Sequence, residues 1–113
     1  MNKLLKNSLQ FMGVTPNSGG KSELPPLIIA SREGYIEIIK LLIGAKAEIN
    51  AKDGIGNTAL IEAAQNGHIE IVKFLLDRKA DFTVKNVNGT TALASSSGHN
   101  DIKELLKKAG AKE

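Results

Sequence analysis

The chain repeats itself at a fixed spacing, and this constrains its architecture more than any other feature of the sequence. Residues 24–52, shifted by 33 positions onto residues 57–85, meet their own residue type twelve times. The first members of these matching pairs are Leu27, Ile28, Ala30, Gly34, Ile36, Glu37, Ile38, Lys40, Leu42, Lys46, Ala47 and Lys52. A period of about 20–50 residues is typical of stacked repeats, whose units bury their apolar faces against one another. The spacing therefore predicts a solenoid.

A third unit follows, and it is shorter. Residues 58–60 recur at the same offset of 33 as residues 91–93, whereas GlyHis at 67–68 recurs at 98–99, an offset of 31. The third unit has therefore lost two residues between these blocks. In a continuous helix, two residues would turn everything downstream by about 200° and bury the wrong face. We therefore expect a shortened or frayed first helix there, and the serines at 95–97 lower its helix propensity further.

Each unit contains two helical patterns separated by a glycine. In the middle unit, Thr58 offers a capping hydroxyl, and Leu60, Ala63 and Ala64 supply the buried stripe of the first helix. Gly67 suits the left-handed conformation that ends a helix. A second helix over about residues 69–78 turns inward the side chains of Ile71, Val72, Leu75 and Leu76. The expected fold class is all-α, an α-solenoid of stacked helix-turn-helix units.

The connections between the units contain turn-forming dipeptides. AspGly at 53–54 and AsnGly at 88–89 favour tight β-turns. Residues 51–57 and 84–90 are therefore expected to project from the helices as β-hairpin-like finger loops.

Composition disfavours several classes of protein. Cysteine is absent, so neither disulfides nor thiolate metal sites can stabilise the fold. No apolar run approaches the roughly 18–20 residues that a membrane span needs. Three Phe, one Tyr and no Trp leave few flat side chains on which nucleobases could stack. The formal charge of +3 is spread along the chain. We expect a cytoplasmic protein with neither a membrane nor a nucleic acid as its partner.

These features resemble the ankyrin repeat. Within a 33-residue period, the middle unit carries ThrAlaLeu followed by AlaAla, then GlyHis, IleValLysPheLeuLeu and LysAlaAsp. The resemblance covers residues 21–113 in three copies, at about 21–52, 53–85 and 86–113. It implies an L-shaped stack of helix pairs, with fingers standing at right angles to the helices and a concave face that binds other proteins.

The copies depart from the family's pattern in two places. Glu23 stands where a finger glycine is usual, so we expect the loop that precedes the first copy's inner helix to be irregular, although Pro25 or Pro26 still suits the first turn of a helix. Ile28 and Ile61 replace the histidine of the inner helix. Packing is therefore expected in place of that histidine's hydrogen bond to the capping threonine.

The two ends of the chain differ from the repeats. Residues 1–20 lie outside the repeat, with Leu5, Leu9 and Met12 on one helical face and residues 13–20 resembling a linker. Two interpretations stay open for them, an N-terminal cap helix over the first unit or a flexible tail. The last helix carries Lys103, Lys107, Lys108 and Lys112, which is typical of a polar cap that closes a stack.

The sequence contains no recognisable catalytic or metal-binding motif. His68 and His99 are the only histidines, and each follows a glycine where an outer helix begins. We expect each to hydrogen-bond a neighbouring loop, as this position does in the family. GlyGlyLysSer at 19–22 lacks the upstream glycine of a phosphate-binding loop, and the serines at 95–97 have no third residue to orient a catalytic pair. We therefore expect a protein that is not an enzyme and uses no cofactor or metal.

The surface least constrained by packing comprises the fingers and the exposed edge of the inner helices. Ile55 and Val87 are apolar at positions expected to face water, and contiguous exposed apolar area often marks an interface. The candidate partner-binding residues are Arg32, Glu33, Lys52, Gly54, Ile55, Asn57, Gln65, Asn66, Lys85, Val87, Asn88 and Thr90.

These residues predict a non-enzymatic module that binds another protein through its finger tips and its concave inner-helix surface. The alternative is a structural role, in which the imperfect terminal units pair with another copy of the chain to form a homo-oligomer.

Overall fold

Three helix pairs make up residues 25–112, the part of the chain that the computed structural model describes. They are α2 (Pro26–Glu33) with α3 (Ile36–Gly44), α4 (Ala59–Gln65) with α5 (Ile69–Asp77), and α6 (Ala92–Ser95) with α7 (Asn100–Ala109). No strand occurs within this range. The expectations for residues 1–20 and for the loop at Glu23 lie outside the described residues.

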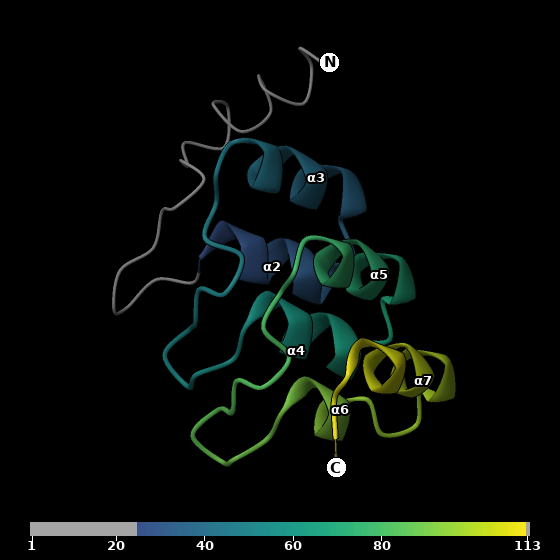
Figure 1. Ribbon diagram of the computed structural model, residues 1–113. Coiled ribbons are helices and arrows are strands. Elements are labelled where there is room, and N and C mark those ends of the chain that lie inside the picture. Colours follow the sequence, from purple (N-terminus) through teal and green to yellow (C-terminus); the bar gives the residue numbers. More distant parts are fainter. Residues whose placement is uncertain (1–24, 113) are drawn as a thin grey trace.

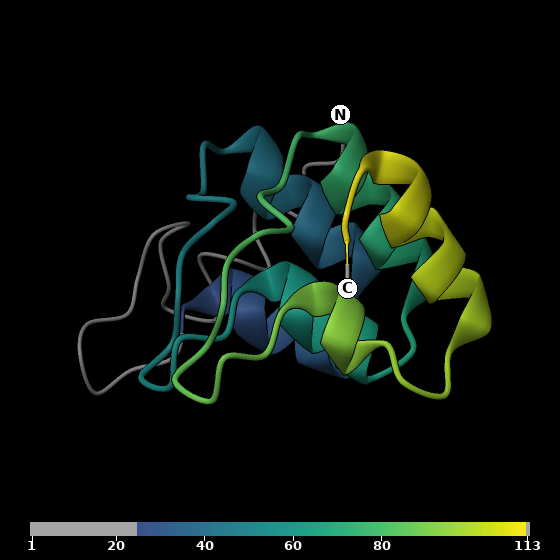
Figure 2. The same ribbon diagram turned by 60° about the horizontal axis from the view of Figure 1, so that its bottom comes forward.

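The helices form two layers (Figures 1 and 2). The inner helices α2, α4 and α6 stack in chain order, and the outer helices α3, α5 and α7 stack in parallel above them. The long loops between successive pairs project toward the same side of the stack, on the left in Figure 2. Each pair packs against the next along the chain, so the all-α solenoid that the repeat predicts is confirmed.

The inner helices begin where the sequence predicts. Thr58 Oγ1 accepts a hydrogen bond from the Ile61 N–H at 3.2 Å, and Thr91 Oγ1 accepts one from the Ala94 N–H at 3.2 Å. Pro26 is the first residue of α2, where its missing N–H costs no helical hydrogen bond. Each start is therefore stabilised by residues of its own unit.

The core is a layer of aliphatic side chains between the inner and outer helices. Leu60 on α4 and Leu75 on α5 are almost fully buried. Ile28 and Ile61 are buried to a similar degree. Apolar packing therefore replaces the expected histidine at these two positions. Burying one such side chain contributes about 1.5–3 kcal/mol, and this stabilises the stack far more than exposed ion pairs do.

The two-residue deletion is absorbed in the inner helix of the third unit. Helix α6 has only four residues, and it is followed by a turn in which Ser96 O accepts from the His99 N–H at 2.8 Å. The buried Ser96 hydroxyl donates to Leu93 O at 2.6 Å. Because the turn takes up the missing residues, Ile102 and Leu106 on α7 keep their buried positions. The expectation of a shortened helix is confirmed.

Ser31 on α2 has a buried hydroxyl with no hydrogen-bond partner among the described residues. Ala64 holds the equivalent position in the second unit. Replacing Ser31 by alanine is expected to raise the free energy of unfolding by about 1 kcal/mol, because a desolvated and unpaired polar group is removed. Urea denaturation measures the change, and Ser97→Ala on the surface is the control. A loss of stability in Ser31→Ala would contradict the inference that the buried Ser31 hydroxyl destabilises the fold.

Candidate functional site

The first finger, residues 51–57, is closed by a β-turn built on Asp53. The Gly56 N–H donates to Asp53 O at 3.1 Å. Asp53 Oδ1 also accepts from the N–H groups of Ile55 and Asn57, at 3.0 and 2.9 Å. A short side-chain acceptor at this position bonds the backbone that follows it and so holds the turn. Gly56 has a φ of 84°, in the left-handed region that favours glycine.

The second finger, residues 84–90, uses Asn86 in the same way. Asn86 Oδ1 accepts from the N–H groups of Asn88 and Thr90 at 2.9 and 3.0 Å, and Asn86 O accepts from the Gly89 N–H at 2.9 Å. The predicted tight turns are confirmed. The dipeptides expected to form them, however, occupy different places, since AspGly begins the first turn and AsnGly ends the second. What the two turns share is an Asp or Asn at the start and a glycine at the end.

The two fingers are bonded to each other. The Val87 N–H donates to Ile55 O at 2.9 Å, and Asn86 Nδ2 donates to Asn57 Oδ1 at 2.9 Å. A Cβ atom on Gly56 would lie 3.0 Å from the Asn86 Cα, so the loops are in backbone contact. The side chains of Ile55 and Val87 remain 52% and 71% exposed. Two apolar tips are thus presented on loops that are joined to each other.

Glu62, a nearly buried carboxylate on α4, connects the first two units beside the fingers. Its Oε2 atom accepts from Arg32 Nη2 at 3.1 Å and from Asn57 Nδ2 at 3.3 Å. Asn66 Nδ2 donates to Glu62 O at 2.8 Å. The hydrogen bond to Glu62 raises the pKa of the Arg32 guanidinium, so this side chain is fixed in its charged form.

The chain of hydrogen bonds continues into the third unit. Arg32 reaches Glu62, Glu62 reaches Asn57, and Asn57 accepts from Asn86 in the second finger. A polar network that is satisfied at each member rigidifies the elements it joins. Side chains from all three units are therefore positioned together on this surface.

Most of the candidate partner-binding residues are accessible. Nine are exposed, namely Glu33, Lys52, Gly54, Ile55, Gln65, Asn66, Lys85, Val87 and Asn88. Arg32 and Thr90 are half-buried. The expectation that Asn57 lies at an exposed tip is wrong, because its side chain is held between Glu62 and Asn86 and is only 5% exposed. Asn57 therefore connects Glu62 to the second finger beneath the exposed residues.

Sequence reasoning missed Glu62 and Asn86. The available signal for Glu62 was a charged residue inside the otherwise apolar stripe of α4, since a carboxylate is rarely buried unless it is paired. The signal for Asn86 was its spacing of 33 from Asp53. Ile29 and Tyr35 were missed as well, and they are large apolar side chains that are 42% and 54% exposed on the first unit.

The two histidines hold neighbouring units together. His68 Nε2 donates to Arg32 O at 2.9 Å, and His99 Nε2 donates to Gln65 O at 3.3 Å. Each histidine was expected to bond a neighbouring loop, and that part of the prediction is wrong, because Arg32 and Gln65 lie in the last turns of the inner helices α2 and α4 of the preceding unit. Gly34 leaves room for this contact, since a Cβ atom there would lie 2.8 Å from His68 Cε1. Within residues 25–112, no three His, Asp or Glu side chains gather where they could hold a metal ion.

A family model that describes ankyrin repeats in three copies matches residues 27–113. The chain belongs to the ankyrin repeat family. Ankyrin repeats are generally protein–protein interaction modules and are typically not enzymes.

A segment of the ankyrin repeat chain is also similar to a plant channel. The potassium channel KOR2 of rice, Oryza sativa subsp. japonica, is 44% identical over 59 residues, which cover 52% of this chain and 8% of the channel. The similarity therefore concerns one segment of that much longer protein. None of the helices described between residues 25 and 112 combines the length and apolarity required to cross a membrane.

Proposed function

We propose that this ankyrin repeat protein binds another protein through its finger tips and its concave inner-helix surface. The observation that supports this most directly is the pair of apolar tips, Ile55 and Val87, on two fingers joined by a backbone hydrogen bond. Exposed apolar side chains on a rigid base are typical anchors of an interface.

The polar surroundings of the tips suit recognition and not catalysis. Lys52 and Lys85 are exposed charged residues on the same fingers. Glu33 and Gln65 are exposed at the C-terminal ends of α2 and α4, the ends of the inner helices that lie away from the fingers. Such groups steer encounter and set orientation more than they add affinity. We infer a non-enzymatic module that uses no cofactor or metal. A cytoplasmic location belongs to the same proposal, since a fold without cysteine needs no oxidising compartment.

Substitution of the tips tests the proposal. Proteins that co-purify with the chain from its native cell are identified by mass spectrometry, and the recovered partner is titrated against variants. Val87→Asp is expected to weaken binding about tenfold or more, because a carboxylate replaces an apolar anchor. Tyr35→Asp is the matched control, since it changes an exposed apolar residue away from the fingers. Equal losses in both variants, or full binding by the Ile55→Asp, Val87→Asp double variant, would overturn the proposal.

Self-association through the terminal units stays a prediction. Light scattering over a dilution series measures it directly. A mass of one chain at every concentration would exclude the homo-oligomer, and a mass that rises with concentration would support it.

A further inference from the structure

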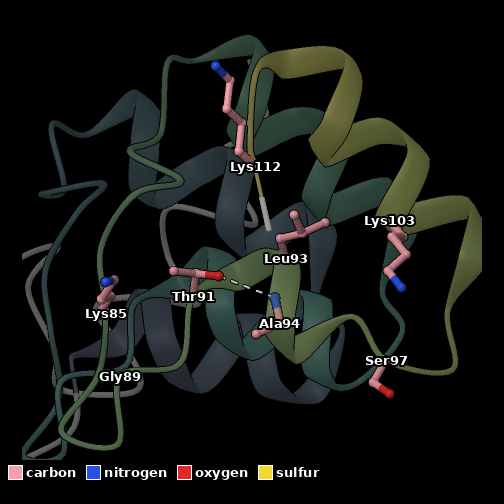
Figure 3. Close-up of a pocket in the computed structure, with 8 residues that line it drawn as sticks. All are labelled: Lys85, Gly89, Thr91, Leu93, Ala94, Ser97, Lys103 and Lys112. Carbon is pink, nitrogen blue, oxygen red and sulfur yellow. Dashed lines mark hydrogen bonds between the residues drawn. The ribbon is translucent and has the colours of Figure 1, made fainter.

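A groove runs along the side of the third unit that faces away from the second unit (Figure 3). One cavity of about 520 Å³ lies between the second finger, α6 and α7. A second cavity of about 260 Å³ shares Lys85, Thr91, Leu93 and Lys112 with it and extends toward Phe82. The two cavities therefore form one elongated surface, which we call the basic groove.

Every charged residue that lines the basic groove is a lysine. Lys85 comes from the second finger, Lys103 from α7 and Lys112 from the segment after α7, and no Asp or Glu lines either cavity. Asp81 precedes the lining residues Phe82 and Thr83 in sequence but does not itself line either cavity. Its Oδ1 atom accepts a hydrogen bond from the Thr83 N–H at 2.8 Å. Composition alone could not show this gathering, because lysines that are far apart along the chain meet only in the folded stack.

The spacing of the lysines favours an extended ligand over a compact one. In Figure 3, the side chains of Lys85, Lys103 and Lys112 stand at three separate edges of the cavity and do not converge on one point. A ligand that contacts all three side chains in these positions must extend from one edge to another. An extended peptide advances about 3.3 Å per residue, so its successive acidic side chains could reach different edges.

Hydroxyl groups also line the basic groove. Thr91 Oγ1 accepts from the Ala94 N–H, which leaves its own hydrogen able to donate. Ser97 adds a second, exposed hydroxyl. Ammonium groups and hydroxyl donors are the complement of carboxylates, and hydrogen bonds to ionised groups are stronger than those between neutral groups.

We propose that the basic groove binds an extended, acidic segment of a partner protein. This surface is distinct from the apolar tips, and Lys85 is the one candidate partner-binding residue that also lines the groove. A partner anchored on Val87 could continue past Lys85 into the groove. The groove is nevertheless tested by itself, through residues that lie outside the fingers.

The probe is a fluorescent peptide of alternating glutamate and serine, and its binding is followed by fluorescence anisotropy at low salt. The same peptide with glutamine in place of glutamate is the neutral comparison. The unaltered chain is expected to bind the acidic peptide and not the neutral one. The Lys103→Gln, Lys112→Gln variant is expected to weaken binding about tenfold, and added salt is expected to weaken it further.

A matched variant distinguishes binding in the basic groove from nonspecific electrostatic attraction between the peptide and the whole chain. Lys73→Gln, Lys108→Gln removes the same charge from exposed positions that do not line the groove, and it is expected to change affinity by less than about twofold. Equal weakening in both variants would overturn the proposal. So would displacement of the peptide by inorganic phosphate at equal total charge, or tighter binding of a single-stranded oligonucleotide of the same charge.

Discussion

Replacement of Leu75 by alanine is expected to lower the free energy of unfolding by about 3 kcal/mol. Leu75 is fully buried on α5, the outer helix of the middle unit, which packs against both α3 and α7. Truncation removes its transfer free energy and leaves a cavity between helices that cannot close fully. A loss of this size is a large fraction of the stability of so small a domain.

The same substitution tests whether the stack unfolds as one unit. Repeat proteins are stabilised by contacts between neighbours, so damage to the middle unit weakens both interfaces at once. Urea denaturation followed by circular dichroism is expected to show one transition, shifted to lower urea, for Leu75→Ala. Lys73→Ala, at an exposed position on the same helix, is expected to change stability by less than about 0.5 kcal/mol. Similar effects of the two variants would contradict the assigned core.

Replacement of Glu62 by alanine is expected to cost about 2 kcal/mol and to loosen the fingers. The change leaves Arg32 and Asn57 without the carboxylate that each contacts. Losing one partner of a buried charged pair is strongly destabilising. The expected loss stays at the lower end because the Arg32 side chain is 39% exposed and can be rehydrated.

A comparison of two variants identifies the physical origin of this effect. Glu62→Gln keeps an amide oxygen that can accept from Asn57 but removes the charge that pairs with Arg32, so a smaller loss is expected. Hydrogen exchange of the Val87 and Asn88 amides reports on the finger, and faster exchange is expected in Glu62→Ala. Protection of these amides identical to that of the unaltered chain would show that Glu62 does not support the second finger.

The local features of the fold could be predicted from the sequence because each depends on neighbouring residues. The cap of α4 joins Thr58 to Ile61, only three residues away. Which face of α7 is buried after the two-residue deletion follows from the rotation per residue of a helix. The repeat itself supplies the long-range pairing, since units that share a sequence stack in a similar way. For this reason a structural hydrogen bond could be expected for His68 and His99, although its acceptor is the end of an inner helix and not a loop.

The polar part of the candidate site could not be predicted in the same way. Glu62 is paired with Arg32, which lies 30 residues away, and Asn57 contacts Asn86, which lies 29 residues away. The equivalent of Glu62 in the first unit is Ile29, so the repeat does not carry this network from unit to unit. Burial of Asn57 depends on how closely the fingers approach, and Gly56 permits that approach through a contact that no local pattern encodes.

The bond between the Val87 N–H and Ile55 O also has a thermodynamic consequence for recognition. A loop that becomes ordered only on meeting its ligand loses about 1–2 kcal/mol of backbone entropy per residue at that moment. Here the two loops are immobilised together when the chain folds, so much of that loss precedes the encounter. Because the two fingers are already ordered, related ligands are expected to differ mainly in their dissociation rates, since association rates vary little within one interface.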